Sequence, residues 1–254
     1  MCLLLFAYRS RPDYELVLAA NRDELFGRPT APAGFWEDHP DLLGGRDLEH
    51  MGTWLGITRA GRFAALTNFR GREAERRVAP SRGDIVRDFL TGSDGVSAYI
   101  ARIERSDGAF NGYNLLLGAD GVSGYHSNRG GHSGALAPGL YGLSNHLLDT
   151  PWPKVERGKR GLREIVDAPG APDVEALFHL LSDSNPAPDA LLPDTGVGME
   201  LERTLSPIFI RGERYGTRCS TVLLISAEGE VRFEERDLAR GSAHRFAFTV
   251  ERGA

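Results

Sequence analysis

The segments Cys2-Leu-Leu-Leu-Phe-Ala-Tyr8 and Glu15-Leu-Val-Leu-Ala-Ala-Asn21 are two apolar runs separated by the polar and turn residues Ser10-Arg-Pro-Asp13. Two such runs with turn residues between them predict a β-hairpin. The end of the second strand of a hairpin returns to the start of the first. The polar quartet Asn21-Arg22-Asp23-Glu24 is therefore expected to lie close to residue 2.

The remainder of the chain alternates short strand-like segments with two helical blocks. The hydrophobic pattern predicts strands at residues 53–58, 62–68, 113–119, 123–128, 140–144, 208–211, 217–226, 231–235 and 245–250. Helices are predicted from the N-cap Ser81 to Gly92, and at residues 95–104, 152–166 and 172–182. Proline and glycine make residues 21–47 and 184–198 loop-like, and the second of these loops is a candidate lid.

These elements predict an α+β fold. Strands joined by hairpins favour antiparallel sheets over βαβ units. Two helical blocks, each lying between runs of strands, can cover the outer faces of two stacked sheets. The 254 residues are 41% hydrophobic and 26% charged, which is typical of a globular protein. Nothing in the sequence marks a boundary, so residues 1–254 are expected to form a single domain.

Charge and composition argue against several classes of protein. The formal net charge of −5 gives no reason to expect a nucleic-acid partner. The apolar run at residues 2–8 is too short for a membrane helix and lacks the basic flank of a signal peptide. We therefore expect no membrane insertion and a cytoplasmic location. Cys2 and Cys219 are too few for a disulfide framework, and the cytosol disfavours a single bridge between them.

The motifs of several other catalytic classes are missing from the sequence. The seven histidines show no H-E-x-x-H spacing, and no C-x-x-C pair exists. There is no nucleophile elbow, P-loop, dinucleotide fingerprint or covalent haem attachment motif. No metal or cofactor is expected.

Cys2 is the first candidate for chemistry. Removal of Met1 would leave a thiol and an α-amine on the same residue. The amine has an ordinary pKa of about 7.7–8.0, so near neutral pH its unprotonated fraction can act as a base. A thiol with an intramolecular base beside it is an activated nucleophile. The alternative is that Cys2 is a small apolar residue opening a buried strand.

Arg22 and Asp23 are the second pair of candidates. Side chains alternate across a strand, so one of the two can point at the Cys2 sulfur and the other away from it. An arginine near a thiol lowers the pKa of that thiol, and a carboxylate can hold an ammonium group or orient an arginine. Strand ends also expose polar residues by chance.

Three further candidates lie at the ends or starts of predicted strands: Asn68, Asn145 and Arg218. An asparagine amide donates two hydrogen bonds and can line an oxyanion hole. Asparagine also caps strands and starts turns, which is the alternative for each of the two. Arg218 can face the cleft or lie at the edge of the sheet.

Taken together, these motifs resemble those of the NRDE family, whose eukaryotic members are called transport and Golgi organisation proteins. The resemblance rests on Met1-Cys2, Asn21-Arg22-Asp23-Glu24, Gly52-Thr-Trp-Leu-Gly56, Leu66-Thr-Asn-Phe-Arg70, Ser81-Arg-Gly83, Gly112-Tyr-Asn-Leu-Leu116, Gly142-Leu-Ser-Asn145 and Thr217-Arg218. At greater distance the layout is similar to the cysteine N-terminal-nucleophile acylases of the choloylglycine hydrolase and penicillin V acylase group. The resemblance implies a four-layer αββα sandwich of two antiparallel sheets.

The same resemblance implies a set of site residues. The acylases use a terminal cysteine, an arginine and an aspartate after the second strand, two asparagines and a late arginine. By position, these roles fall on Cys2, Arg22, Asp23, Asn68, Asn145 and Arg218. The arginine and aspartate of the acylases stand several residues apart but are adjacent here, which leaves their separate roles open.

Two functions compete at this point. The first is hydrolysis of a non-peptide amide or related acyl bond of a small-molecule substrate, with Cys2 as the nucleophile. The second is non-catalytic binding or trafficking of haem or of acyl-CoA or lipid-type ligands, because eukaryotic relatives are linked to haem movement and lipid metabolism. Fold alone does not decide between them.

Overall fold

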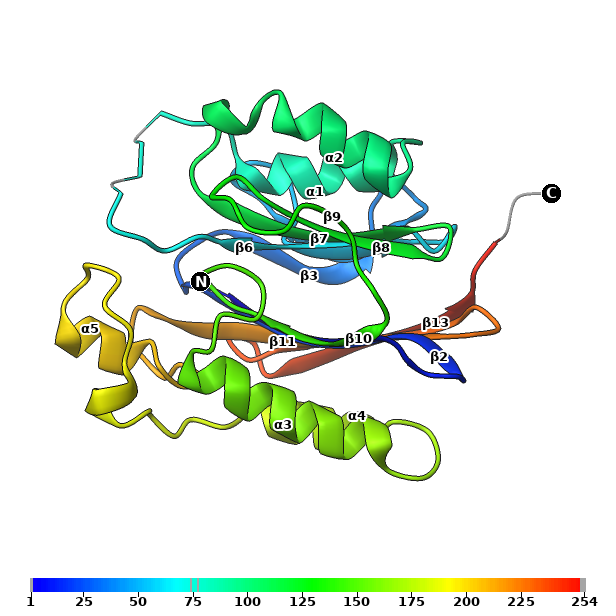
Figure 1. The fold of residues 1–254 in the computed structure, drawn as a ribbon. Coiled ribbons are helices and arrows are strands. Elements are labelled where there is room, and N and C mark those ends of the chain that lie inside the picture. Colours follow the sequence, from blue (N-terminus) through cyan, green and yellow to red (C-terminus); the bar gives the residue numbers. More distant parts are fainter. Residues whose placement is uncertain (1, 74, 77, 252–254) are drawn as a thin grey trace.

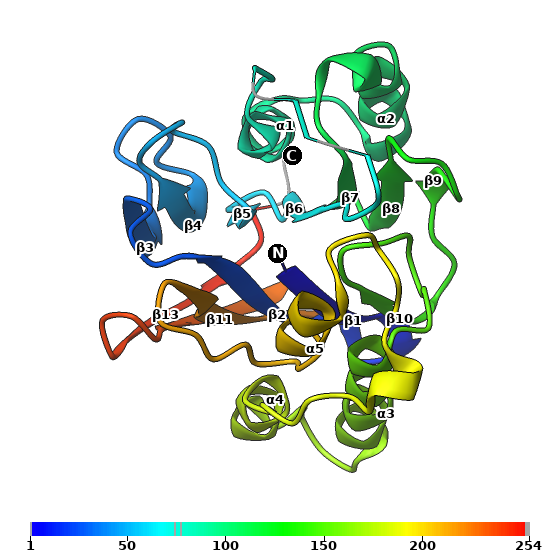
Figure 2. The same cartoon turned by 90° about the vertical axis from the view of Figure 1, so that its left-hand side faces the viewer.

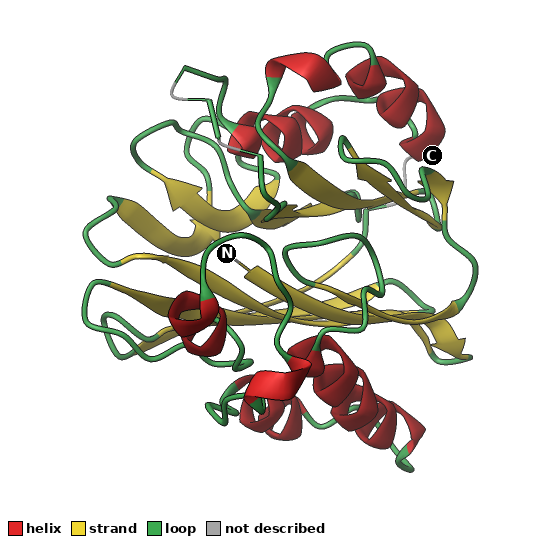
Figure 3. Ribbon diagram, turned by 60° about the vertical axis from the view of Figure 1, so that its left-hand side comes forward, coloured by secondary structure: helices red, strands yellow, loops and turns green. Residues whose placement is uncertain are grey.

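The structure is a computed structural model that describes residues 2–73, 75–76 and 78–251. Two antiparallel sheets stack face to face, and helices cover the outer face of each sheet (Figure 1, Figure 3). The layers therefore follow the order αββα, and the predicted four-layer sandwich is confirmed.

The first sheet contains the predicted N-terminal hairpin and has the strand order β10-β1-β2-β11-β12-β13. The bounds of its strands are β1 Cys2–Arg11, β2 Tyr14–Leu25, β10 Gly139–Leu143, β11 Tyr215–Ser226, β12 Glu230–Asp237 and β13 Ser242–Thr249. In the hairpin Cys2 lies opposite Arg22, as the sequence pattern predicts. The other side of β2 is occupied by β11, which comes from the far end of the chain.

The second sheet has the order β3-β4-β5-β6-β7-β8-β9, so its strands follow one another along the chain. Their bounds are β3 Thr30–Phe35, β4 Leu42–Asp47, β5 Leu55–Thr58, β6 Phe63–Asn68, β7 Tyr113–Ala119, β8 Val122–Ser127 and β9 Gly134–Ala135. Strand β6 ends at Asn68, and Figure 1 shows that it ends on the side of the sandwich where the N-terminus lies.

Helices α1 (Arg82–Thr91) and α2 (Val96–Glu104) cover the second sheet, and α3 (Pro153–Asp167) and α4 (Val174–Leu181) cover the first (Figure 1). The short helix α5 (Met199–Thr204) lies at the end of the sandwich where β1 begins (Figure 2). The Ser81 hydroxyl accepts a hydrogen bond from the Gly83 backbone N–H at 3.2 Å, which confirms the predicted cap of α1.

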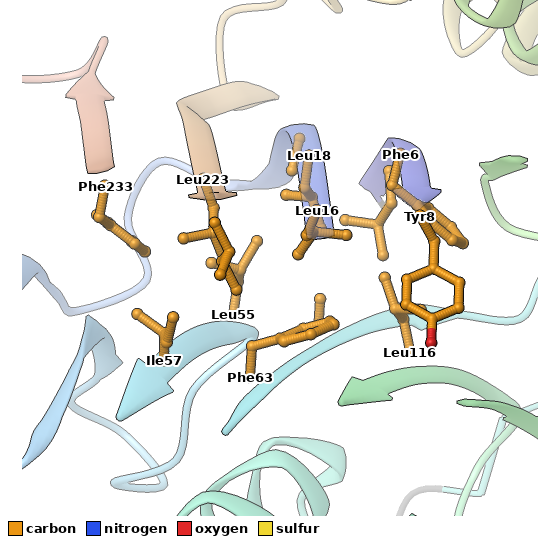
Figure 4. Packing of buried hydrophobic residues seen from close by; sticks show 14 of the residues in the cluster. Phe6, Tyr8, Leu16, Leu18, Leu55, Ile57, Phe63, Leu116, Leu223 and Phe233 are labelled. Atoms are coloured by element: carbon orange, nitrogen blue, oxygen red, sulfur yellow. The ribbon is translucent and has the colours of Figure 1, made fainter. Parts of the chain in front are cut away.

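The main core lies between the two sheets, where side chains of both inner faces interdigitate (Figure 4). On β1 the residues Leu4, Phe6 and Tyr8 point into this core. The intervening Leu3 and Leu5 pack against α3 and α4 in a second core. Because β1 is buried on both faces, its sequence is a continuous apolar run instead of an alternating one.

The prediction of a loop over residues 21–47 is wrong for most of that range. Strand β2 continues to Leu25, and β3 and β4 follow it. Of the residues that suggested a loop, Pro32 lies in the edge strand β3, Gly44 and Gly45 lie in β4, and Pro29 and Pro40 lie outside these strands. The pairing register of β3 with β4 shifts between Ala31 and Gly34. Proline has no N–H to donate to a neighbouring strand. An edge strand tolerates Pro32 because one of its sides has no neighbour and needs no donor.

The strand predicted at residues 208–211 is also wrong. All four of these residues are described, and their backbone is irregular and joins neither sheet. Ile208 and Ile210 are nevertheless buried, so the apolar character of the segment reflects burial alone. Residues 184–198 are mostly irregular, as predicted, apart from a single 3-10 turn at Asp189–Leu191. Helix α5, directly after them, was not predicted from the sequence.

Candidate active site

Cys2 lies at the start of β1, and Arg22 lies between it and Cys219. Cys2 is paired with Arg22 across β1 and β2, and Cys219 is paired with Arg22 across β2 and β11. Residues paired across strands point to the same face, so all three side chains point toward the second sheet. The two cysteines are separated by two strand spacings, roughly 9–10 Å, which is beyond the reach of a disulfide. Both are free thiols.

A cavity of about 240 Å³ opens at this end of the sandwich, between the two sheets and the start of α1. Four of the six residues proposed from the sequence contribute to its wall: Cys2, Arg22, Asp23 and Asn68. Asn145 and Arg218 lie behind the wall.

Arg22 is held rigidly beside the nucleophile. Its side chain is 6% exposed, and its guanidinium carbon lies 4.0 Å from the centre of the Trp54 ring. The Nη1 donates a 3.4 Å hydrogen bond to the Thr30 hydroxyl, and the Nη2 lies 3.6 Å from the Glu24 carboxylate. A cation that stacks on an aromatic face and is largely dry keeps its position and its field. Arg22 therefore supplies fixed positive charge to the Cys2 end of the cavity.

The Asp23 side chain points to the opposite face of β2. Its carboxylate accepts a 2.7 Å hydrogen bond from the Thr217 hydroxyl on β11. Burial raises the pKa of this carboxyl, while the nearby charge of Lys154 on α3 lowers it. The backbone N–H of Asp23 lowers the pKa of the Cys2 thiol. Strand alternation thus separates the two adjacent residues: Arg22 faces the cavity, and Asp23 faces the helical layer behind it.

The protonation of Cys2 reflects opposing influences. Burial raises the pKa of the thiol and the Asp23 carboxylate raises it further, whereas Arg22 and the backbone N–H of Asp23 lower it. Burial raises the pKa of Cys219 well above its usual value, and the buried Glu235 beside it acts in the same direction. A thiol that is not ionised at rest needs a base before it can attack a carbonyl.

The two asparagines meet directly. The Asn145 side-chain amide donates a 2.8 Å hydrogen bond to the backbone carbonyl of Asn68, and the Asn145 backbone carbonyl accepts one from the Arg70 backbone N–H at 2.6 Å. The adjacent Ser144 hydroxyl donates to the Cys2 carbonyl at 3.2 Å. Asn145 therefore ties the end of β6 to the segment after β10, while Asn68 is the one of the two that lines the cavity.

A buried polar network around Asn114 fixes this junction. Its amide nitrogen donates to the Thr67 hydroxyl at 3.1 Å and to the His146 carbonyl at 3.0 Å. Its oxygen accepts from the Tyr125 hydroxyl at 2.7 Å. Thr67 in turn donates to the Ser144 carbonyl at 2.6 Å. Because Asn114 is fully buried, each of these bonds forms in a low-dielectric interior where an unmade bond is costly.

Arg218 holds a turn in place. It lies in an irregularity of β11, between the residues paired with Asp23 and Arg22. One guanidinium nitrogen donates to the carbonyls of Leu25, Phe26 and Arg28 at 3.3, 3.0 and 2.8 Å. Arg28 lines the cavity, so Arg218 shapes the wall without contacting the space itself.

Sequence reasoning missed three residues that build this region: Trp54, Asn114 and Lys154. Trp54 and Asn114 are contained in motifs that carry the family resemblance, but nothing in the sequence assigned them a contact. Lys154 could have been noticed by composition, since it is one of only two lysines in the chain. Its burial to 2% exposure is a tertiary feature.

Two negative findings hold for the part of the chain that the structure describes. Histidine, cysteine, aspartate and glutamate side chains do not gather there in any group of three or more that could hold a metal ion. Among the same residues, no helix has the length and apolar character needed to cross a membrane.

Comparisons with known proteins agree with this geometry. The family model described as Transport and Golgi organisation 2 matches residues 1–240. The Transport and Golgi organization protein 2 homolog of Bos taurus is 37% identical, with 98% of each chain covered. The Homo sapiens homolog is 36% identical, with 99% of this chain and 100% of the relative covered. Transport and Golgi organization protein 2 of Drosophila melanogaster is 32% identical, with 96% and 94% covered.

Solved structures with the same fold have little sequence similarity to this chain. A Caenorhabditis elegans ortholog of N-acylethanolamine-hydrolyzing acid amidase superposes with a TM-score of 0.50 at 12% identity, covering 88% of this chain and 92% of its own. A C2A mutant of the conjugated bile acid hydrolase from Clostridium perfringens gives 0.51 at 10% identity, covering 100% and 99%. These similarities show that the fold is that of the N-terminal-nucleophile hydrolases.

Proposed function

The chain belongs to the Transport and Golgi organisation 2 family, and from its site we propose that it is an N-terminal-nucleophile hydrolase. Its reaction would be cleavage of a non-peptide amide or related acyl bond through Cys2. The observation that carries this proposal is the position of Cys2: it opens β1 in the wall of a cavity, directly beside a dry and immobilised arginine. The fold relatives named as an amidase and a hydrolase support the same class of reaction.

The mechanism begins with removal of Met1, which frees the α-amine of Cys2. The neutral amine accepts the thiol proton, and the thiolate attacks the substrate carbonyl carbon to form a tetrahedral intermediate. The C–N bond then breaks, and the ammonium returns its proton to the leaving amine. Water, deprotonated by the same amine, attacks the thioester; the acid leaves and the Cys2 thiol is restored. Because burial raises the thiol pKa, the amine is the group that generates the thiolate.

The surrounding residues stabilise the developing charges or hold the site in position. Arg22 stabilises the thiolate by its fixed charge. Asn68 lines the cavity, and we propose its side-chain amide as the donor to the oxyanion. Asn145 holds the Asn68 backbone in place, and Arg218 holds the turn that presents Arg28. Asn145 and Arg218 therefore act as positioning residues.

The alternative, a carrier of haem or acyl-CoA or lipid-type ligands, fits the cavity less well. Ligand pockets typically enclose about 300–1,000 Å³. A volume of about 240 Å³ matches a small acyl or amide group better than a haem.

The test compares the wild-type protein with Cys2→Ala and, as a matched control, Cys219→Ala. Intact mass first establishes whether Met1 is absent. Each protein is then incubated with a panel of small N-acyl amides and thioesters, and product release and acylated protein are followed by mass spectrometry. We expect turnover and an acyl adduct on residue 2 in the wild type and in C219A, and neither in C2A.

Retained turnover in C2A, or a population that keeps Met1 or is acetylated on Cys2, would contradict the amine-assisted mechanism. A titration with haemin is run in parallel and followed by visible absorbance. Stoichiometric haemin binding together with no turnover on the panel would favour the carrier function instead.

A further inference from the structure

The chain uses lysine at one deeply buried position. Of its 30 basic residues only Lys154 and Lys159 are lysines, and all the others are arginines. Lys154 is 2% exposed. Arginine stays charged in proteins, whereas a buried lysine can give up its proton within the physiological range. A chain that otherwise uses arginine therefore places the titratable cation in this interior.

Lys154 lies in the first turn of α3, the helix that packs on the outer face of β1 (Figure 1). Its ammonium donates a 3.0 Å hydrogen bond to the Leu205 carbonyl, directly after α5. The Asp23 side chain points to the helical layer that contains α3, where it accepts a hydrogen bond from the Thr217 hydroxyl. The charged or titratable groups that act on the pKa of Lys154 are Asp23 from β2, Arg70 after β6, Cys2 from β1 and Glu202 from α5.

These four neighbours are not equivalent. Arg70 and Glu202 form their own ion pair at 2.9 Å, with side chains 10% and 3% exposed. The charges of that pair largely offset each other at a distance. The positive charge of Lys154 therefore acts mainly on the protonation of Asp23 and of Cys2.

We infer that Lys154 is a positioning residue of the active site, a cation behind the nucleophile that offsets Asp23 and favours the reactive protonation states of Cys2. The inference rests on the proposed role of Cys2 as nucleophile. It concerns how the site sets the charge of that residue, and it assigns no contact between Lys154 and substrate.

The direction of the effect follows from the signs of the charges. A nearby carboxylate disfavours a thiolate and favours an α-ammonium, so Asp23 alone opposes the mechanism on both groups. A nearby ammonium does the reverse: it stabilises the thiolate and keeps the α-amine neutral. Burial lowers the pKa of Lys154 to about 8, and Asp23 acts against that change. The cation is thus mostly present at pH 7 and is lost as the pH rises above 8.

The first test removes the charge while varying the hydrogen bond. Lys154→Gln keeps a donor for the Leu205 carbonyl, Lys154→Met does not, and Lys159→Gln removes a charge from the same helix as a control. The rate of Cys2 alkylation by iodoacetamide is measured between pH 5.5 and 9.5 by peptide mapping, with thermal midpoints recorded in parallel.

Both Lys154 variants should alkylate Cys2 about three- to tenfold more slowly at pH 7, with the alkylation midpoint moved to higher pH. K159Q should follow the wild-type profile. An effect in K154M alone would assign the change to the lost hydrogen bond and overturn the inference. A K154Q profile within twofold of the wild type would overturn it as well.

A second test uses the wild-type protein, so it holds even if the variants fold poorly. Lysine labelled with ¹³C at Cε yields only two signals in this chain, and Lys159 serves as the internal reference. Carbamidomethylation of Cys2 removes the thiolate, and by reciprocity the midpoint of Lys154 should fall while the Lys159 signal is unchanged. An unchanged Lys154 titration would contradict the inference. Absence of substrate turnover would contradict the proposed hydrolase function without altering either readout.

Discussion

Replacement of Asn114 by alanine is expected to destabilise the protein more than any surface change and to disorganise the site. Asn114 is fully buried and makes hydrogen bonds to Thr67, His146 and Tyr125. Alanine removes all three bonds. Thr67 keeps its own hydrogen bond to the Ser144 carbonyl. The His146 carbonyl loses its bond from the Asn114 amide, and the Tyr125 hydroxyl loses its acceptor.

The size of the effect follows from those contacts. A buried group that loses its partner costs about 1–3 kcal/mol. Two such groups and one weaker loss give a decrease of about 3–4 kcal/mol in the free energy of unfolding. For a domain of this size each kcal/mol lowers the thermal midpoint by about 2–4 °C. The midpoint of Asn114→Ala is therefore expected to fall by about 6–16 °C.

The assay is thermal unfolding followed by circular dichroism, with two comparison variants. Tyr125→Phe removes one of the three bonds, together with the 3.1 Å bond that the Tyr125 hydroxyl accepts from the Leu148 N–H, and should cost about 1–3 kcal/mol. Asn185→Ala alters an exposed asparagine and should stay within about 0.5 kcal/mol. The loss in the N114A/Y125F double variant should be smaller than the sum of the single losses, since the two residues share a bond.

The reasoning would be refuted by an Asn114→Ala protein as stable as Asn185→Ala. Turnover gives an independent readout, because the network places Ser144, whose hydroxyl donates to the Cys2 carbonyl. If the proposed hydrolase activity is observed, the folded N114A protein should lose it well below the thermal midpoint. Full activity in N114A would show that the network supports stability alone.

Limiting iodoacetamide near neutral pH should label Cys2 before Cys219, because burial raises the pKa of Cys219 well above its usual value while Cys2 lines an open cavity; peptide mapping that finds Cys219 modified first would contradict this. Glu202→Gln should cost about 3–5 kcal/mol in urea unfolding, because it removes the buried carboxylate charge that pairs with the Arg70 guanidinium. The double variant with Arg70→Met should lose less than the sum of the single losses, and a near-neutral E202Q would show that the pair contributes little.

Much of the site could be predicted from the sequence because a hairpin fixes its own pairing. The apolar runs and the turn at Ser10–Asp13 place the start of β1 opposite the end of β2 without any knowledge of the rest of the fold. The juxtaposition of Cys2 and Arg22 therefore follows from local pattern, and the register confirms it. Asn68 could likewise be placed at the end of a strand, and it does line the cavity.

Other features were beyond local pattern. Pro32 in β3 favoured a loop, yet an edge strand tolerates it because its free side needs no donor. Ile208 and Ile210 suggested a strand, yet both serve burial, and Ile208 does so in the core beneath α3 and α4. In both cases the sequence pattern describes a side chain's environment, and more than one backbone conformation satisfies that environment.

By itself the sequence determined which segments pair as hairpins, which faces are apolar, and that a cysteine and an arginine meet at one end of a sheet. Only the tertiary structure decided that β11 joins β2, that Asp23 faces the helical layer, and that Lys154 is buried behind the nucleophile. The physical reason is that period-two patterning encodes the face a side chain occupies but not its partner. Desolvation and the fields of distant charges, which set protonation, arise only when remote segments pack together.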